Sequence, residues 1–176
     1  MSRPEPDLTI LEIARAIARS MTGEDHARMA IEEYTFSLLL WVIHPEADLA
    51  WLPAKLELPV DDIWKKGDPI ISSLGRDIGR VSLRSGCSFK FVAPQDISLP
   101  DGLWAAIEVL KSHRDVLIGL DQDGAKLKFY AGIFSGGSAS MERLDWTLLA
   151  ALAGLRISLD LGFYSAEPAA LSSSQS

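Results

Sequence analysis

Residues 34–43 read YTFSLLLWVI, a run rich in aromatic and β-branched residues whose second half has apolar side chains on both alternating faces. This pattern is typical of a strand at the centre of a sheet. His44 and Pro45 end the run, and Leu49, Leu52 and Leu56 then indicate a short helix. We expect the sheet to be built around residues 34–43.

Two later segments alternate apolar with polar residues, as half-buried strands do. In residues 125–134 the apolar side chains oppose Lys126, Lys128 and Tyr130. In residues 155–164 they oppose Arg156, Ser158, Asp160 and Tyr164. A parallel sheet covered on both sides would not permit such polar faces. The pattern predicts an α+β fold, a ferredoxin-like two-layer sandwich whose mixed or antiparallel sheet has helices on one face.

The segments between these strands are assigned from helical periodicity and turn residues. Residues 99–112 and 140–153 show helical spacing, and 115–120 favour a helical turn over a short strand. Residues 81–92 predict one bulged strand or a tight pair, broken at Ser85 and Gly86. Residues 61–80, with three glycines, predict a long ordered loop around Trp64.

The N-terminal region has an amphipathic helix of its own. From Leu8 to Met21, apolar residues recur at helical spacing, with Asp7 placed to cap the start and Gly23 beyond the end: Ile10, Ile13, Ala14, Ile17 and Met21. We therefore expect a helical extension at 1–33, one domain at 34–164 and a disordered tail at 165–176. The extension packs on its own domain, giving a monomer, or on a second copy, giving a homodimer.

Composition restricts the location and the partners. The only cysteine is Cys87, which excludes an internal disulfide, and no apolar run has the length or flanks of a signal peptide or membrane span. We expect a cytoplasmic protein without membrane attachment. The net charge of −7 disfavours nucleic acid and would suit a basic protein partner.

Four short motifs follow one another in a recognisable order: His44-Pro45 after the first strand, Leu56-Glu57-Leu58-Pro59, Trp64-Lys65-Lys66-Gly67-Asp68, and Ala151–Leu155 running into Leu159-Asp160. In this order, residues 34–164 resemble a bacterial family known as domain of unknown function four-two-seven-nine. The resemblance implies a single domain over these residues. It implies no catalytic residues, because the family has no established activity.

No familiar catalytic or metal-binding set is complete. Asp61, Asp62 and Asp68 match no metal-ligand spacing and are better interpreted as loop carboxylates. Cys87 could pair with His44 or His113 as nucleophile and base, but a lone cysteine is more often buried in a core. We predict no cofactor, no metal and no catalytic residue, and lean against an enzyme.

Two surfaces are left as candidate binding sites. One is the polar sheet face formed by Lys126, Lys128, Tyr130, Arg156, Asp160 and Tyr164. The other is the 61–80 loop, where Trp64 could line a pocket and Lys66, Gly67 and Asp68 form either a charged tip or a structural turn. The first hypothesis is a protein-binding module of immunity or regulatory type, which uses acidic loops or the open sheet face. The alternative is a small-molecule binder or enzyme with its pocket near Trp64.

Overall fold

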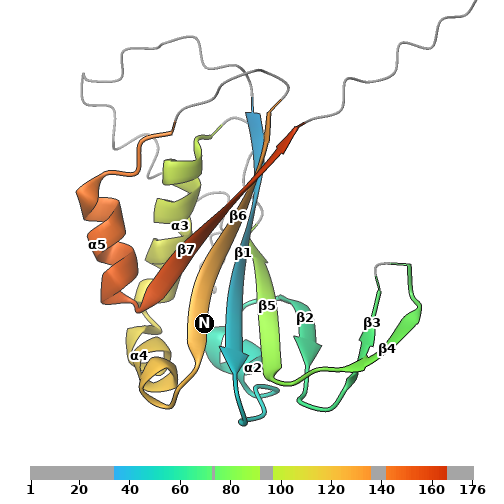
Figure 1. Ribbon diagram of the computed structural model, residues 1–176. Coiled ribbons are helices and arrows are strands. Elements are labelled where there is room, and N and C mark those ends of the chain that lie inside the picture. The colour runs from blue at the N-terminus through green and yellow to red at the C-terminus, as the bar shows by residue number, and fades with distance from the viewer. Residues whose placement is uncertain (1–33, 73, 92–96, 136–141, 166–176) are drawn as a thin grey trace, which may run out of the picture.

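The computed structural model describes residues 34–72, 74–91, 97–135 and 142–165. Its main sheet has five strands in the order β2-β5-β1-β6-β7 (Figure 1). Their bounds are β1 Tyr34–His44, β2 Val60–Trp64, β5 Ser85–Phe91, β6 Lys126–Ser135 and β7 Ile157–Ser165. β1 is antiparallel to both neighbours, whereas β6 and β7 are parallel. The prediction that residues 34–43 form the central strand is confirmed.

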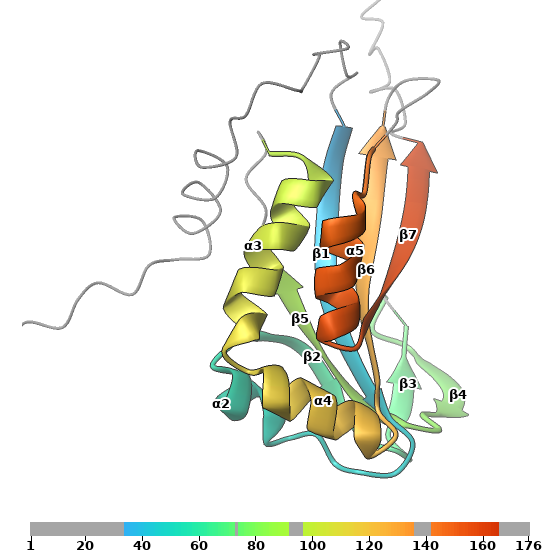
Figure 2. The same cartoon turned by 90° about the vertical axis from the view of Figure 1, so that its left-hand side faces the viewer.

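The helices lie on one face of this sheet (Figure 1 and Figure 2), and within the described residues no helix lies on the other face, which we call the open face. Their bounds are α2 Leu52–Leu56, α3 Leu99–Lys111, α4 Arg114–Gln122 and α5 Trp146–Gly154. The α+β class and the mixed sheet are therefore confirmed, whereas the ferredoxin-like arrangement is not. No helix in the described ranges is long and apolar enough to cross a membrane.

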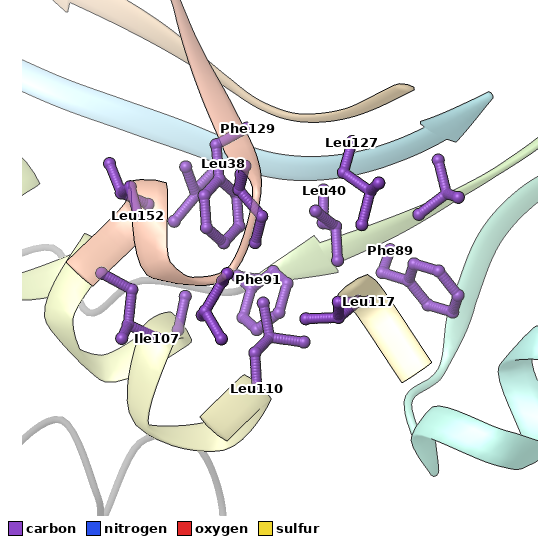
Figure 3. Packing of buried hydrophobic residues seen from close by; sticks show 14 of the residues in the cluster. Leu38, Leu40, Phe89, Phe91, Ile107, Leu110, Leu117, Leu127, Phe129 and Leu152 are labelled. Atoms are coloured by element: carbon purple, nitrogen blue, oxygen red, sulfur yellow. The ribbon is translucent and has the colours of Figure 1, made fainter. Parts of the chain in front are cut away.

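The hydrophobic core fills the space between the sheet and its helices (Figure 3). Leu38, Leu40 and Val42 alternate along β1 and are at most 1% exposed, which places the even positions of this strand on the covered face. Phe91 of β5 and Phe129 of β6 pack edge to face in this core, with ring centroids 5.7 Å apart. The helices contribute Leu103, Ile107, Leu110, Leu117, Leu148 and Leu152.

The prediction of one long loop at 61–80 is wrong. β2 completes one edge of the sheet, and β3 Pro69–Ile71 and β4 Asp77–Val81 form a separate two-stranded hairpin. These strands have only three to five residues. Two of the three glycines that indicated a loop lie in the turns between these strands, since Gly67 and Gly75 have φ values of 94° and 73°, which favour glycine, whereas Gly79 lies within β4.

The last helix starts later than its periodicity suggests. Residues 140–153 were expected to be helical, but 140 and 141 lie outside the described residues and α5 begins at Trp146. The cause is Asp145, whose Oδ1 accepts the backbone N–H of Leu148 at 2.8 Å and so caps the helix. Residues 142–144 are therefore not part of the helix.

The Asp145 cap predicts a pH-dependent contribution to stability. Its pKa is lowered from the usual 3.8 by the hydroxyl of Thr147 and the N–H of Leu148. A lowered pKa gives stability that is present above the unfolded-state value and lost as the pH falls through the folded one. We expect wild type to melt at a higher temperature than Asp145→Asn at a pH above 3.8, and the difference to shrink at a pH well below 3.8. Thermal melts at both pH values test this, and a constant difference would contradict it.

Two predicted segments fall outside the described residues. They are the N-terminal extension, with its helix at Leu8–Met21, and the tail beyond Ser165. Ser165 itself, where the predicted tail began, is the last residue of β7. Both segments stay predictions.

Candidate functional site

The open face of the sheet carries most of the residues predicted as a polar surface. Tyr130 of β6 pairs with Asp160 of β7, and Lys128 of β6 pairs with Trp41 of β1, so these four side chains lie close together. They belong to positions that alternate with the buried ones on each strand. The structure therefore brings Lys128, Tyr130, Asp160 and Tyr164 onto one surface, as predicted, because β6 and β7 are neighbours.

Aromatic side chains run across this open face, and we call Trp64, Trp41, Tyr130, Tyr164 and Phe134 the aromatic row. Ring centroids of Trp64 and Trp41 are 6.4 Å apart in an edge-on arrangement, and those of Trp41 and Tyr130 are also 6.4 Å apart. The hydroxyls of Tyr130 and Tyr164 share a hydrogen bond that raises the pKa of Tyr130. Phe134 stacks on Tyr164 at 5.0 Å. The row thus reaches from β2 at one edge of the sheet to β7 at the other.

Two glycines make room for the row. A Cβ at Gly86 of β5 would lie 2.3 Å from Cζ2 of Trp64, and one at Gly162 of β7 would lie 2.4 Å from the Tyr130 hydroxyl. Both distances are far below van der Waals contact, so a side chain at either position would displace a ring. The sequence offered Gly86 only as a break in a strand, and its role depends on a residue from β2 that no local pattern connects to it.

Lys128 contacts both the aromatic row and the carboxylate of Asp160. Its Nζ lies 5.2 Å from the centroid of the Trp41 ring and donates to Oδ2 of Asp160 at 2.7 Å. A cation over an indole face is attracted by the ring quadrupole, and the carboxylate holds it there. Lys126 and Ser158 are exposed nearby on the same two strands. The surface is therefore aromatic at its centre and polar along β6 and β7.

The indole N–H of Trp41 is the one polar side-chain atom among the described residues that is buried without a hydrogen-bond partner. Buried donors are nearly always paired in folded proteins, and an unpaired one costs about 1–3 kcal/mol. The sequence could not indicate this atom, because Trp41 sits inside an apolar run that reads as core. This unpaired donor lies in the middle of the aromatic row.

The Lys66-Gly67-Asp68 segment forms a structural turn. Lys66 Nζ pairs with Oε1 of Glu46 at 2.6 Å, and Oδ2 of Asp68 accepts the N–H of Lys65 at 2.7 Å. Lys65 pairs in turn with Asp48, and this contact lowers the pKa of the Asp48 carboxyl. Gly67 supplies the left-handed turn. These contacts favour the structural interpretation over a ligand-binding tip.

Arg156 lies apart from the other predicted residues. Its φ is 60°, and it precedes the first residue of β7. Its Nε is 3.9 Å from Oδ2 of Asp121 on α4, which belongs to the helical layer. The left-handed backbone thus breaks the alternation that would have placed Arg156 beside Ser158 and Asp160.

The possible catalytic and metal-binding groups have structural roles. Cys87 is completely buried, and burial raises the pKa of its thiol to about 12, which suppresses the thiolate that a nucleophile needs. Nδ1 of His44 accepts the N–H groups of Glu46 and Ala47, so it is not free to act as a base. Asp61 accepts a hydrogen bond from Ser88. Within the described ranges, no group of three or more His, Cys, Asp or Glu side chains could hold a metal ion.

The chain matches no known family model, and no curated protein or solved structure is significantly similar to it. The resemblance of residues 34–164 to the bacterial family named above stays a prediction. What the protein does has to be inferred from the open face itself.

Proposed function

We propose that this chain is a non-enzymatic protein-binding module, of regulatory or immunity type, that binds its partner with the open face of the sheet. The aromatic row on that uncovered face carries the proposal. Tyr and Trp are enriched among the residues that dominate binding energy at protein interfaces. Paired strands also hold the row in place before binding, which reduces the entropy that a partner must overcome.

The unpaired Trp41 N–H supports a covered state of this face. In the isolated protein the buried donor has no acceptor, and a partner that supplied a carbonyl or carboxylate oxygen would remove that cost. Reaching the N–H requires nearby side chains to move. Lys128, which lies over the Trp41 ring, is long and flexible enough to do so. The proposed partner therefore places an oxygen acceptor at the centre of the row.

A site-specific photo-crosslinker in the native host tests the proposal. The probe replaces Ser158, an exposed residue on the open side of β7, and a matched probe replaces Lys111, an exposed residue at the end of α3 in the helical layer. We expect one discrete protein adduct from the probe at 158 and none from the probe at 111. The same adducts from both positions, or none from either, would count against the open face as an interface.

Trp41→Phe separates binding from folding. The change keeps a ring in the row but deletes the N–H, so the lost indole contacts are offset by removal of an unpaired donor. We expect the free energy of unfolding to stay within about 1 kcal/mol of wild type in urea titrations. The adduct formed from position 158 should fall at least about tenfold, the equivalent of one lost hydrogen bond of 1.4 kcal/mol. An undiminished adduct would show that the indole N–H does not contact the partner.

A small-molecule site at Trp64 is the second candidate. Trp64 is only partly buried, so part of its indole surface is available for a flat ligand to stack on. This alternative predicts no protein adduct in the experiment above. It also predicts a melting temperature that rises with a small-molecule extract of the host and no longer rises in Trp64→Ala.

A further inference from the structure

The helical layer leaves part of β7 uncovered. Leu161 and Phe163 share the covered face of the sheet with Ile157, because alternate residues of a strand point to the same side. Their partners on β6, Ala131 and Ile133, are 0% and 3% exposed, but Leu161 and Phe163 are 41% and 69% exposed. The helices therefore cover β6 but leave the second half of β7 exposed.

The outer side of α5 is also apolar and exposed. Trp146 and Leu149, one turn apart, are 78% and 46% exposed, and Ala150 and Ala153 on the same side are exposed as well. No charged residue occurs in the first or last turn of α5. A helix that borders water normally has a polar outer face, whereas one that is apolar all round is normally covered on both sides.

These two features belong to consecutive elements, α5 and β7, which are in contact with each other and lie on the same side of the sheet. We call Trp146, Leu149, Leu161 and Phe163 the apolar strip. Burial of these four side chains would remove apolar surface from water, which favours a structure in which the strip is covered. The remaining question is what covers it.

The described chain begins at the same end of the molecule as the strip. Tyr34 pairs with Ser135, and Ser135 pairs with Ser165, two residues beyond Phe163. The Tyr34 hydroxyl donates to Glu142, shortly before α5, and accepts the N–H of Leu99 at the start of α3. Tyr34, where the described chain begins, thus lies at the end of the helical layer where α3 starts, close to the chain that leads into α5.

We propose that residues 8–21 of this chain form a helix that docks in cis on the apolar strip. The segment carries a matching stripe of Ile10, Ile13, Ile17 and Met21. Residues 22–33 connect it to β1 and can span up to about 40 Å when extended, far more than the roughly 14 Å length of a nine-residue helix such as α5. The other terminal segment, residues 166–176, has only one large aliphatic residue, Leu171, and offers no such stripe.

This docking goes beyond the proposed function and is independent of it. The apolar strip belongs to the helix-covered side of the sheet, and the aromatic row belongs to the open side. Loss of either interaction leaves the other surface unchanged.

Thiol reactivity of the full-length chain tests the proposal. Ala150→Cys places a reporter on the outer side of α5 without removing any residue of the strip, and the native Cys87 stays silent because it is completely buried. Leu83→Cys serves as the control reporter, because Leu83 is 75% exposed and follows β4, which lies on the opposite side of the molecule from α5 (Figure 1). Each reporter is reacted with a disulfide reagent in three backgrounds: wild type, Ile17→Glu in the stripe, and Arg19→Glu on the polar side of the predicted helix.

We expect Ile17→Glu to raise the rate at position 150 at least about tenfold, as undocking exposes the thiol. Arg19→Glu should leave that rate unchanged, and neither change should affect position 83. Light scattering should give a monomer for all variants. A second variant changes the docking site and leaves residues 8–21 unaltered. Phe163→Glu should speed trypsin cleavage at Arg15 and Arg19, because it weakens the docking of residues 8–21 on the apolar strip.

Two results would overturn the proposal. A rate at position 150 that Ile17→Glu does not change would show that residues 8–21 do not cover α5. Protection that disappears on dilution, together with a dimer mass that Phe163→Glu converts to a monomer, would show that a second copy covers the strip.

Discussion

Phe129→Ala is expected to lower the free energy of unfolding by about 3 to 5 kcal/mol, which is the usual range for removing a fully buried aromatic ring. Phe129 is 0% exposed and lies in the middle of β6, next to the central strand. Its ring packs edge-on against Phe91 of β5, so the change also removes an aromatic pair that bridges β1. Urea unfolding of wild type and variant measures the difference.

Phe134→Ala is the matched control for Phe129→Ala. It makes the same chemical change on the same strand, but Phe134 is 39% exposed on the open face and stacks only on Tyr164. We expect a loss of about 0.5 to 1.5 kcal/mol from the aromatic pair. Equal losses for the two variants would contradict the assignment of the core to the helix-covered face.

His44→Ala is expected to lower the free energy of unfolding by about 2 to 4 kcal/mol, because it removes a buried ring together with its three hydrogen bonds to the backbone. His44 is 5% exposed at the end of β1. Its Nδ1 accepts from Glu46 and Ala47 at 3.0 and 2.6 Å, so Nε2 carries the hydrogen and donates to the carbonyl of Asp123 at 3.0 Å. The side chain thus joins the turn after β1 to the turn after α4.

His113→Ala provides the comparison for His44→Ala. His113 is only partly buried at the start of α4, and its side chain makes no cap hydrogen bond there. A loss of about 1 kcal/mol or less is expected from urea unfolding. If His44→Ala were as mild, the hydrogen bonds of His44 would not contribute to the fold as described.

The sequence predicted well those strands in which the polarity of alternate side chains shows which face is buried and which is exposed. β1 is apolar on both sides because helices cover its even positions while Trp41 and its neighbours pack on the open face. β6 alternates cleanly because its open face keeps Lys126 and Lys128. β2, β3 and β4 were missed because a strand of three to five residues is too short to establish a period, and the glycine turns between them are also typical of loops.

The candidate site was predictable in part. Lys128, Tyr130, Asp160 and Tyr164 could be grouped because they occupy alternate positions of two strands that turn out to be adjacent. Trp64 could be selected, but not its contact with Trp41, since β5 stands between their strands and only Gly86 lets the rings meet. Arg156 was misplaced because a single left-handed residue changes the direction of the chain without a signal in the side-chain pattern.

The central position of β1 also determines the order in which the protein can fold. Tyr34 and Ile43 pair with Ser135 and Lys126, so one whole edge of this strand must wait for a segment made much later in synthesis. Pairing between such distant segments has a high contact order, which slows folding, and it leaves one edge of the apolar run at 34–43 unpaired until β6 has been made. β5 is synthesised first and pairs with the other edge. The nascent chain therefore passes through a stage in which its most aggregation-prone strand is only half paired, and it is this strand that a chaperone would need to protect.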